Sequence, residues 1–302
     1  MRETGTELLF SVDGTFAPWP GFGGLIERCV MPLFTIVEGQ FRHIGTGFII
    51  SHNGLMMTAK HVLEEGQRYR TRRLNNNGEY YDHWELYALY TTDRPNDDPS
   101  DSTLGGLIPI DLIYCPEALD IALSWLKPLK NVTDDSQLTF PQIGLSARMP
   151  RVGEKIVGCG YHGSALETTR TNEGVLVDYD RKTAVSSGTI IELHPSGRDA
   201  GMLTFPCFRT DTRFESGMSG GPIFCEDGYV CGVICSSMAP TEDDSSYLSY
   251  GSWIKPAFGI QMEAIIEPNT VVEKMLLYDF AKKGFVETDE SFDLVRLKED
   301  ES

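Results

Sequence analysis

The chain has 302 residues, of which 41% are hydrophobic and 23% are charged, so it can bury one or two hydrophobic cores. Its formal net charge of −18 argues against nucleic acid as a partner, because surfaces that bind nucleic acid are basic. No run approaches the ~18 apolar residues of a membrane-spanning helix, so a membrane partner is not expected either.

Short apolar or alternating runs, separated by turn residues, occupy most of the chain up to about residue 255. This pattern is typical of an all-β barrel protein. We predict a first barrel over residues 25–130 and a second over residues 150–255, joined by a linker. The strand-like runs are residues 33–37, 47–51, 87–91, 121–126, 155–159, 174–179, 188–193, 203–208 and 230–236.

The end of the chain has a different periodicity. Apolar residues recur every three or four positions, from Phe258, Met262 and Ile265 onward to Met275 and Phe280. This spacing favours helices over strands. We therefore predict a helical C-terminal extension over residues 256–302 that packs on the barrels and ends in a solvated tail.

Two residues of the first half indicate acid–base chemistry. His61 follows the second of two strand-like runs that are joined by a turn at residues 53–54. Alone, it would be interpreted as a structural histidine of the core. Asp120 lies in the otherwise apolar residues 118–126, where a buried carboxylate is costly unless it is paired. The alternative for Asp120 is a turn residue ahead of a strand.

Residues 217–222 read Gly-Met-Ser-Gly-Gly-Pro and place Ser219 between glycines. Glycines there allow backbone amides to converge on a reacting carbonyl group. The same string is also compatible with an ordinary turn between two strands. A serine hydroxyl is a weak nucleophile at neutral pH, so a catalytic Ser219 needs an imidazole as base and an acid to orient it.

Residues 58–62, 120–123 and 217–222 together resemble the signature segments of trypsin-like (chymotrypsin-fold) serine peptidases, in that family's order of His, Asp and Ser. Residues 45–48 and 230–234 look closer to bacterial high-temperature-requirement peptidases than to digestive trypsins. The resemblance implies two packed six-stranded antiparallel β-barrels, with His61 and Asp120 on the first and Ser219 on the second. It also places the loop of His162 near the active site.

The resemblance implies a serine endopeptidase that needs no cofactor and no metal. Ser219 would attack a peptide carbonyl, His61 would act as general base and then general acid, and Asp120 would orient the imidazole. The backbone N–H groups of Gly217 and Ser219 would hold the oxyanion. A protein or peptide is the expected substrate, and a regulatory protein is a further expected partner.

The chain departs from the secreted digestive members of that family. They carry an acidic residue before the serine, which captures a freshly cut N-terminus; here that position is Met218. Two of their cysteine positions hold Val62 and Glu215. The chain has 7 Cys without a C-x-x-C pair, which favours free buried thiols over a metal cluster. The N-terminus also lacks a signal-peptide pattern, so we expect a cytoplasmic location.

The substrate pocket is harder to predict. Counting back from the serine places Arg213 near the pocket base, where it would favour an acidic side chain. In the alternative, Arg213 faces solvent or pairs with Asp211 or Glu215. The strand that contains Ser236 should offer its edge to the substrate backbone, and the acidic residues 241–246 should overhang the cleft.

Two other functions remain open at this point. The chain could be a protein-interaction module of the same fold that cuts little, with its cleft blocked or its oxyanion amides turned away. An esterase that uses the same nucleophile is the third possibility. The intact set of Ser219, His61 and Asp120 favours the peptidase.

Overall fold

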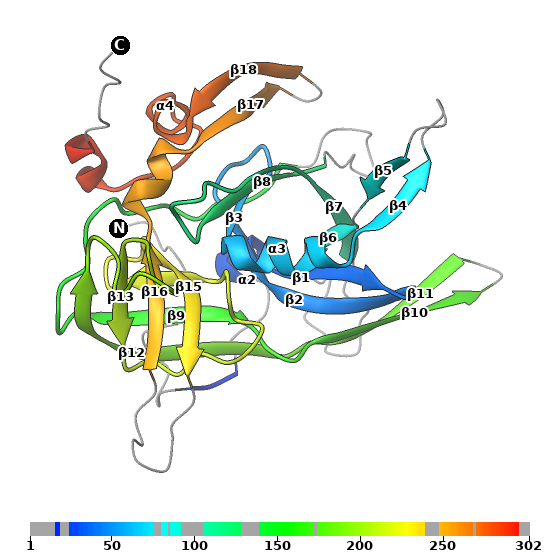
Figure 1. The fold of residues 1–302 in the computed structure, drawn as a ribbon, viewed down its shortest axis with the longest axis horizontal. Coiled ribbons are helices and arrows are strands. Elements are labelled where there is room, and N and C mark those ends of the chain that lie inside the picture. The colour runs from blue at the N-terminus through cyan, green and yellow to red at the C-terminus, as the bar shows by residue number, and fades with distance from the viewer. Residues whose placement is uncertain are drawn as a thin grey trace.

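In the computed structural model, the described residues are 16–18, 24–74, 80–83, 85–91, 105–127, 139–171, 174–238, 248–267 and 270–295. Two closed antiparallel barrels of six strands each dominate the fold (Figure 1). The prediction of an all-β protein with two six-stranded barrels is therefore confirmed.

The first barrel has the strand order β1-β2-β3-β8-β7-β6. A short helix, α2, precedes it, α3 follows β3, and the small β4–β5 hairpin follows α3. The bounds are α2 Leu25–Cys29, β1 Val30–Val37, β2 Gln40–Ile49, β3 Leu55–Thr58, α3 Lys60–Arg68, β4 Thr71–Leu74, β5 Tyr80–His83, β6 Leu86–Thr91, β7 Gly105–Tyr114 and β8 Ala122–Leu126. All residues of β3 and β8 are buried, which explains why these strands read as continuous apolar runs.

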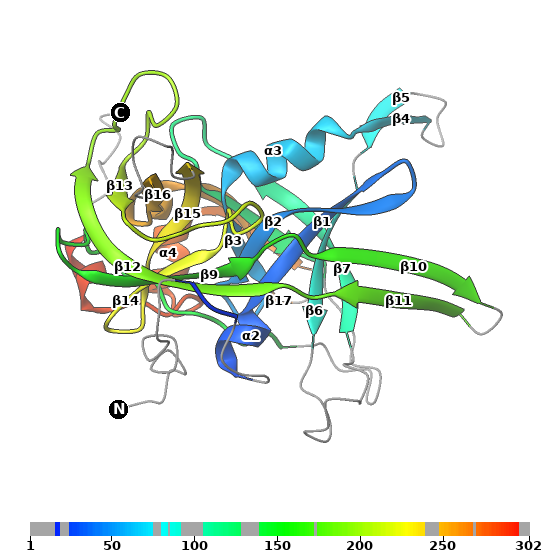
Figure 2. The same cartoon turned by 90° about the horizontal axis from the view of Figure 1, so that it is seen from below.

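The second barrel has the strand order β12-β13-β16-β15-β14-β9. Between β9 and β12 the chain forms the hairpin β10–β11, a long arm that reaches β2 of the first barrel (Figure 2). The bounds are β9 Lys155–Tyr161, β10 Ala165–Thr171, β11 Gly174–Asp180, β12 Thr183–His194, β13 Cys207–Thr210, β14 Pro222–Cys225, β15 Val230–Met238 and β16 Leu248–Trp253.

One continuous apolar core joins the two barrels. Residues of β1, such as Val30 and Leu33, belong to the same buried cluster as Cys159 and Tyr161 of β9. The hydroxyl group of Tyr161 crosses this interface and donates to the carbonyl of Val30 at 3.2 Å. Any site between the barrels therefore lies on a close-packed apolar core of low dielectric constant.

The C-terminal segment corrects a prediction. Residues 261–276 form a β-hairpin, β17 Gln261–Glu267 and β18 Thr270–Leu276, and not helices. Among the described residues after 254, the helical elements are η1 Lys255–Gly259, α4 Leu277–Lys282 and η2 Glu290–Leu294. The helical spacing was misleading because burial in β17 alternates: Met262 and Ala264 are buried, and Gln261 is exposed.

The hairpin and α4 cover the first barrel. The indole N–H of Trp125 in β8 donates to the carbonyl of Glu263 at 2.9 Å, and its ring meets Phe280 of α4 edge-on. Across the described residues, no helix has the length and apolar character needed to cross a membrane. All seven cysteines are free.

Candidate active site

His61 is the second residue of α3, which begins two residues after β3 ends. Val62 and Leu63 are buried and anchor this first turn on the barrel. Asp120 stands just before β8, and β3 pairs with β8 so that Thr58 lies opposite Ala122. Strand pairing therefore brings the two segments together, although 59 positions separate His61 from Asp120.

The imidazole of His61 and the carboxylate of Asp120 form a close pair. The Nδ1–H group of His61 lies 2.9 Å from Oδ2 and 3.0 Å from Oδ1 of Asp120, and the backbone N–H of His61 donates to Oδ1 at 3.0 Å. The Asp120 side chain is 12% exposed and that of His61 is 41% exposed. This geometry fixes the tautomer, so that Nε2 carries the lone pair on the more open side of the ring.

Burial disfavours the protonated imidazole of His61, but the hydrogen bond and charge of Asp120 outweigh it, with help from Glu65 and Glu64. The pKa of His61 is therefore raised above its ordinary value. A base with a raised pKa accepts a proton more readily, which suits an imidazole that takes a proton from a hydroxyl group.

Ser219 lies in the loop before β14 and packs against the first barrel. Its carbonyl accepts the backbone N–H of Thr46 at 2.8 Å. Gly45 makes this approach possible, because a Cβ there would lie 2.7 Å from the Val62 methyl groups and 2.9 Å from the Ser219 carbonyl oxygen. The glycine thus brings the helix of His61 and the loop of Ser219 to a common point.

Backbone hydrogen bonds shape the loop of Ser219. The N–H groups of Met218, Gly220 and Gly221 donate to the carbonyls of Glu215 at 3.0 Å, Ile234 at 2.8 Å and Met218 at 2.9 Å. By contrast, the N–H groups of Gly217 and Ser219 donate to no group within the described parts of the chain. These are the two amides expected to hold an oxyanion.

Sequence reasoning missed His43, a residue of β2. A Cβ on Gly217 would lie 2.7 Å from Cε1 and 3.0 Å from Nδ1 of His43. The Nε2–H of His43 donates to the carbonyl of Gly45 at 2.9 Å. Burial lowers the pKa of His43 to about 4, with His162 adding to the shift and the Gly45 bond opposing it. The ring is therefore neutral at pH 7, and the only sequence signal was its position two residues before Gly45.

Arg213 is engaged locally. Its guanidinium bonds Glu215, with Nε to Oε1 at 2.6 Å, and lies 4.4 Å from the centre of the Phe16 ring. Asp211 is used elsewhere, since it accepts from the N–H and hydroxyl groups of Thr189 at 2.6 and 2.9 Å. Of the two alternatives for Arg213, the structure favours the local pair over the base of a substrate pocket.

A hollow of about 450 Å³ opens beside the His61–Asp120 pair. Its lining includes Glu117, Leu119 and Met202, together with Ser236 of β15. β14 pairs with β15 only as far as Val233, so the edge of β15 beyond residue 234 is open to this hollow. The predicted acidic overhang, residues 241–246, lies outside the described residues.

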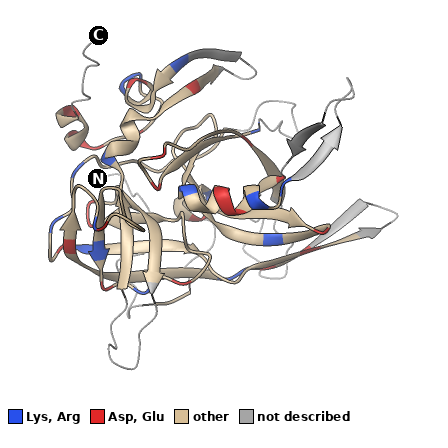
Figure 3. Cartoon of the chain, in the orientation of Figure 1, with Lys and Arg blue, Asp and Glu red and all other residues tan. Residues whose placement is uncertain are grey.

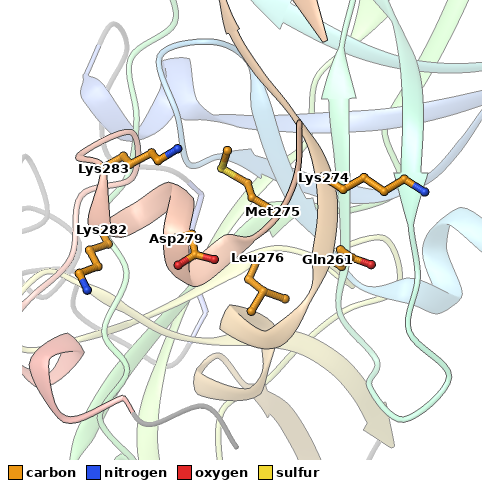
Figure 4. Close-up of a pocket in the computed structure, with 7 residues that line it drawn as sticks. All are labelled: Gln261, Lys274, Met275, Leu276, Asp279, Lys282 and Lys283. Atoms are coloured by element: carbon orange, nitrogen blue, oxygen red, sulfur yellow. The ribbon is translucent and has the colours of Figure 1, made fainter. Parts of the chain in front are cut away.

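Ser219 does not line this first hollow, and two further hollows contain neither His61 nor Ser219. One, of about 720 Å³, shares Lys60, Glu64 and Glu117 with the first and continues it along α3, where charges of both signs alternate (Figure 3). The other, of about 390 Å³, lies between β18 and α4. Its Lys274 and Lys282 point in different directions, so they do not form a convergent site (Figure 4). His162, in turn, packs edge-on against Phe16 at 5.5 Å.

Comparison with known proteins identifies the family. The profile of the trypsin-like peptidase domain matches residues 45–233, which include His61, Asp120 and Ser219. The chain belongs to the trypsin-like peptidase domain family. A search of the curated proteins gives no match. Among solved structures, the protease domain of MamO from Magnetospirillum magneticum in its apo form matches with 13% identity and a TM-score of 0.45, over 77% of this chain and 95% of that one.

The matched residues of this trypsin-like peptidase domain begin at Gly45 and end at Val233. They take in the second half of β2, where Thr46 binds the Ser219 loop, the His61–Asp120 pair and the start of β15. No group of three or more His, Cys, Asp or Glu side chains in the described residues has the arrangement of a metal site. The chemistry available at this site is that of a hydroxyl, an imidazole, a carboxylate and two backbone amides.

Proposed function

We propose that the chain is a serine endopeptidase. Ser219 is the nucleophile, His61 the general base and then general acid, and Asp120 the group that orients His61. One observation carries the proposal: Asp120 holds the Nδ1–H side of His61, while the amides of Gly217 and Ser219 remain without a protein acceptor in the described residues. A base beside Asp120 and two amides in the loop of Ser219 are thus both available.

The reaction follows from these roles. Nε2 of His61 takes the hydroxyl proton as Ser219 Oγ attacks the peptide carbonyl, and the carbonyl oxygen gains a negative charge between the two amides. His61 then gives its proton to the leaving amine, and an acyl-enzyme on Ser219 remains. Water attacks this ester with His61 again as the base, which releases the acid and restores the hydroxyl group.

The substrate is proposed to be a protein or peptide whose backbone adds a strand to the open edge of β15 near Ser236. Its neighbouring side chains would enter the hollow that Leu119 and Met202 help to line. We also propose a closer relation to bacterial high-temperature-requirement peptidases, on residues 45–48 and 230–234, and a cytoplasmic location, which the seven free thiols support.

A second function keeps a specific observation in its favour. No hydrogen bond joins Ser219 Oγ to His61 among the described residues, as expected of an interaction module that cuts little. Serine and histidine are often further apart before substrate binds, however, so this geometry does not exclude catalysis.

A fluorophosphonate probe separates the two functions, because only an activated serine attacks its phosphorus, displaces fluoride and forms a phosphonate ester. We expect labelling of the wild type and of Ser216→Ala, an exposed serine in the same loop, but none of Ser219→Ala. Turnover of a peptide library then distinguishes a peptidase from an esterase. A folded wild type that no fluorophosphonate labels would refute the proposal and leave the interaction module.

A further inference from the structure

Thr46 of β2 connects the two halves of the proposed active site. It is fully buried, and each of its polar groups is used. The hydroxyl group donates to the carbonyl of Gly217 at 2.8 Å and accepts the backbone N–H of Tyr161 at 3.0 Å. The backbone N–H donates to the carbonyl of Ser219 at 2.8 Å, and the Thr46 carbonyl accepts from the hydroxyl of Thr58 at 2.7 Å.

The direction of the hydroxyl proton is fixed. Because Oγ1 of Thr46 accepts the N–H of Tyr161, its single hydrogen is available for the carbonyl of Gly217. Tyr161 and Gly217 both belong to the second barrel, and Thr46 belongs to the first. The Thr46 hydroxyl group therefore links the two barrels both as a donor and as an acceptor, which a methyl group in its place could not do.

These bonds hold the peptide units around an oxyanion amide. The N–H of Ser219 belongs to the peptide between Met218 and Ser219, whose carbonyl is held by Gly221. The peptide before it carries the carbonyl of Gly217, and the peptide after it carries the carbonyl of Ser219. Thr46 binds both of those carbonyls, so it fixes the units on either side of the amide that would meet the oxyanion.

Thr46 also contacts the segment that leads to the proposed base, His61. Thr58, whose hydroxyl bonds the Thr46 carbonyl, is the last residue of β3 and stands three positions before His61. No space separates these groups, because a Cβ on Gly220 would fall 2.1 Å from the Thr46 carbonyl oxygen and 2.2 Å from the Thr58 hydroxyl oxygen. The nucleophile loop thus contacts the start of the His61 segment through Thr46.

We propose that Thr46 is a positioning residue for the hydrolysis described above, on which this inference rests. Its hydroxyl group sets the orientation of the oxyanion amides relative to Ser219 and His61. Thr46 touches neither substrate nor the reacting atoms. A displacement of about 1 Å in a reacting group costs ~100-fold in rate, so loss of the hydrogen bond from Thr46 to Gly217 should lower the reaction rate measurably.

Three variants test the proposal. Thr46→Val keeps the shape but removes the hydroxyl group, and Thr46→Ser keeps the hydroxyl group. Thr35→Val is the matched control, because Thr35 is also buried in the first barrel and donates to a backbone carbonyl, that of Glu85, at 3.0 Å. Labelling rates with fluorophosphonate and amide hydrogen exchange are measured well below the melting temperature of every variant.

We expect Thr46→Val to be labelled about 10- to 100-fold more slowly than the wild type. Thr46→Ser and Thr35→Val should stay within about threefold of it. Hydrogen exchange in Thr46→Val should rise in the peptide that covers residues 215–221 and stay unchanged in strands of the same barrel. A general packing defect would instead raise exchange throughout both barrels.

Labelling of Thr46→Val at the wild-type rate would overturn the proposal, and so would a Thr46→Ser variant as slow as Thr46→Val. If the wild type is not labelled, the proposed peptidase function is refuted. The positioning role of Thr46 can still be tested, because amide hydrogen exchange does not depend on catalytic activity. In that case, local exchange at residues 215–221 in Thr46→Val still supports the link, and its absence removes it.

Discussion

Replacement of Gly217 by alanine tests whether the loop geometry produces the proposed catalysis. The backbone at Gly217 has φ of +96°, which costs a non-glycine residue about 1–3 kcal/mol. The new Cβ would lie 2.7 Å from Cε1 of His43, whereas carbon atoms prefer at least ~3.5 Å. The same Cβ would lie 2.9 Å from the backbone carbonyl oxygen of Tyr161, which cannot rotate away, so the loop must shift, by roughly 0.8 Å if His43 stays bonded to Gly45.

A retreat of this size displaces an oxyanion donor. We expect kcat to fall about 100-fold, because removal or misplacement of such a donor typically costs 10²–10³-fold. The matched control is Gly153→Ala, where φ is +82° and nothing lies within 4 Å of the added Cβ. That variant should lose a similar free energy of unfolding and keep kcat unchanged.

The assay compares kcat and KM on a peptide reporter with melting temperatures for the wild type and both variants. Strain alone would reduce the melting temperatures of the two variants and leave both rates intact. If Gly217→Ala keeps kcat within about threefold of Gly153→Ala, the amide of Gly217 does not act on the transition state.

Two further predictions concern titration and specificity. Catalysis needs neutral His61, whose pKa is raised, so activity should increase with pH with a midpoint above 6.5. Asp120→Asn should reduce kcat by about 10⁴-fold. A midpoint below 6.5 in the wild type would contradict the role of Asp120. Because Arg213 already bonds Glu215, Arg213→Ala should leave the cleavage sites found on denatured proteome peptides unchanged. If the wild type prefers acidic residues before the cut and Arg213→Ala loses that preference, Arg213 lines the substrate pocket after all.

Local signals predicted the fold where each strand carried its own pattern. Fully buried strands such as β3 and β8 are continuous apolar runs in the sequence, so they were recognised. The hairpin β17–β18 was not, because Phe258, Met262 and Ile265 fall at helical spacing, whereas the residues of β17 that are buried, Met262 and Ala264, are two positions apart. Pairing decided between them: Met262 lies opposite Met275, and this contact is invisible to periodicity within one segment.

The candidate site divides in the same way. His61, Asp120 and Ser219 were predicted because each lies in a short segment whose residue types indicate its chemistry. His43 and Thr46 were not assigned a role, because their significance lies in contacts with Gly217 across the barrel interface, 171 positions away in the case of Thr46. The sequence left the role of Arg213 undecided for a related reason. Counting positions gives the place of Arg213 along the loop, but not the group with which its guanidinium pairs.

Met218 helps to explain how the loop of Ser219 is held without an acidic residue at position 218. Its side chain is fully buried in a cluster with Ile156, Phe214 and Ile234 of the second barrel. Burial of a methionine contributes about 1.5–3 kcal/mol, comparable to a partly buried ion pair but independent of pH and of a free N-terminus. Apolar packing of Met218 and hydrogen bonding by Thr46 both act on this loop, and both groups lie beside Gly160, where an added Cβ would be 3.1 Å from Met218 Cβ and 3.1 Å from Thr46 Oγ1. The shape of the loop of Ser219 therefore rests on contacts within and between the two barrels, and the proposed catalysis does not require an ion pair with a newly cut N-terminus.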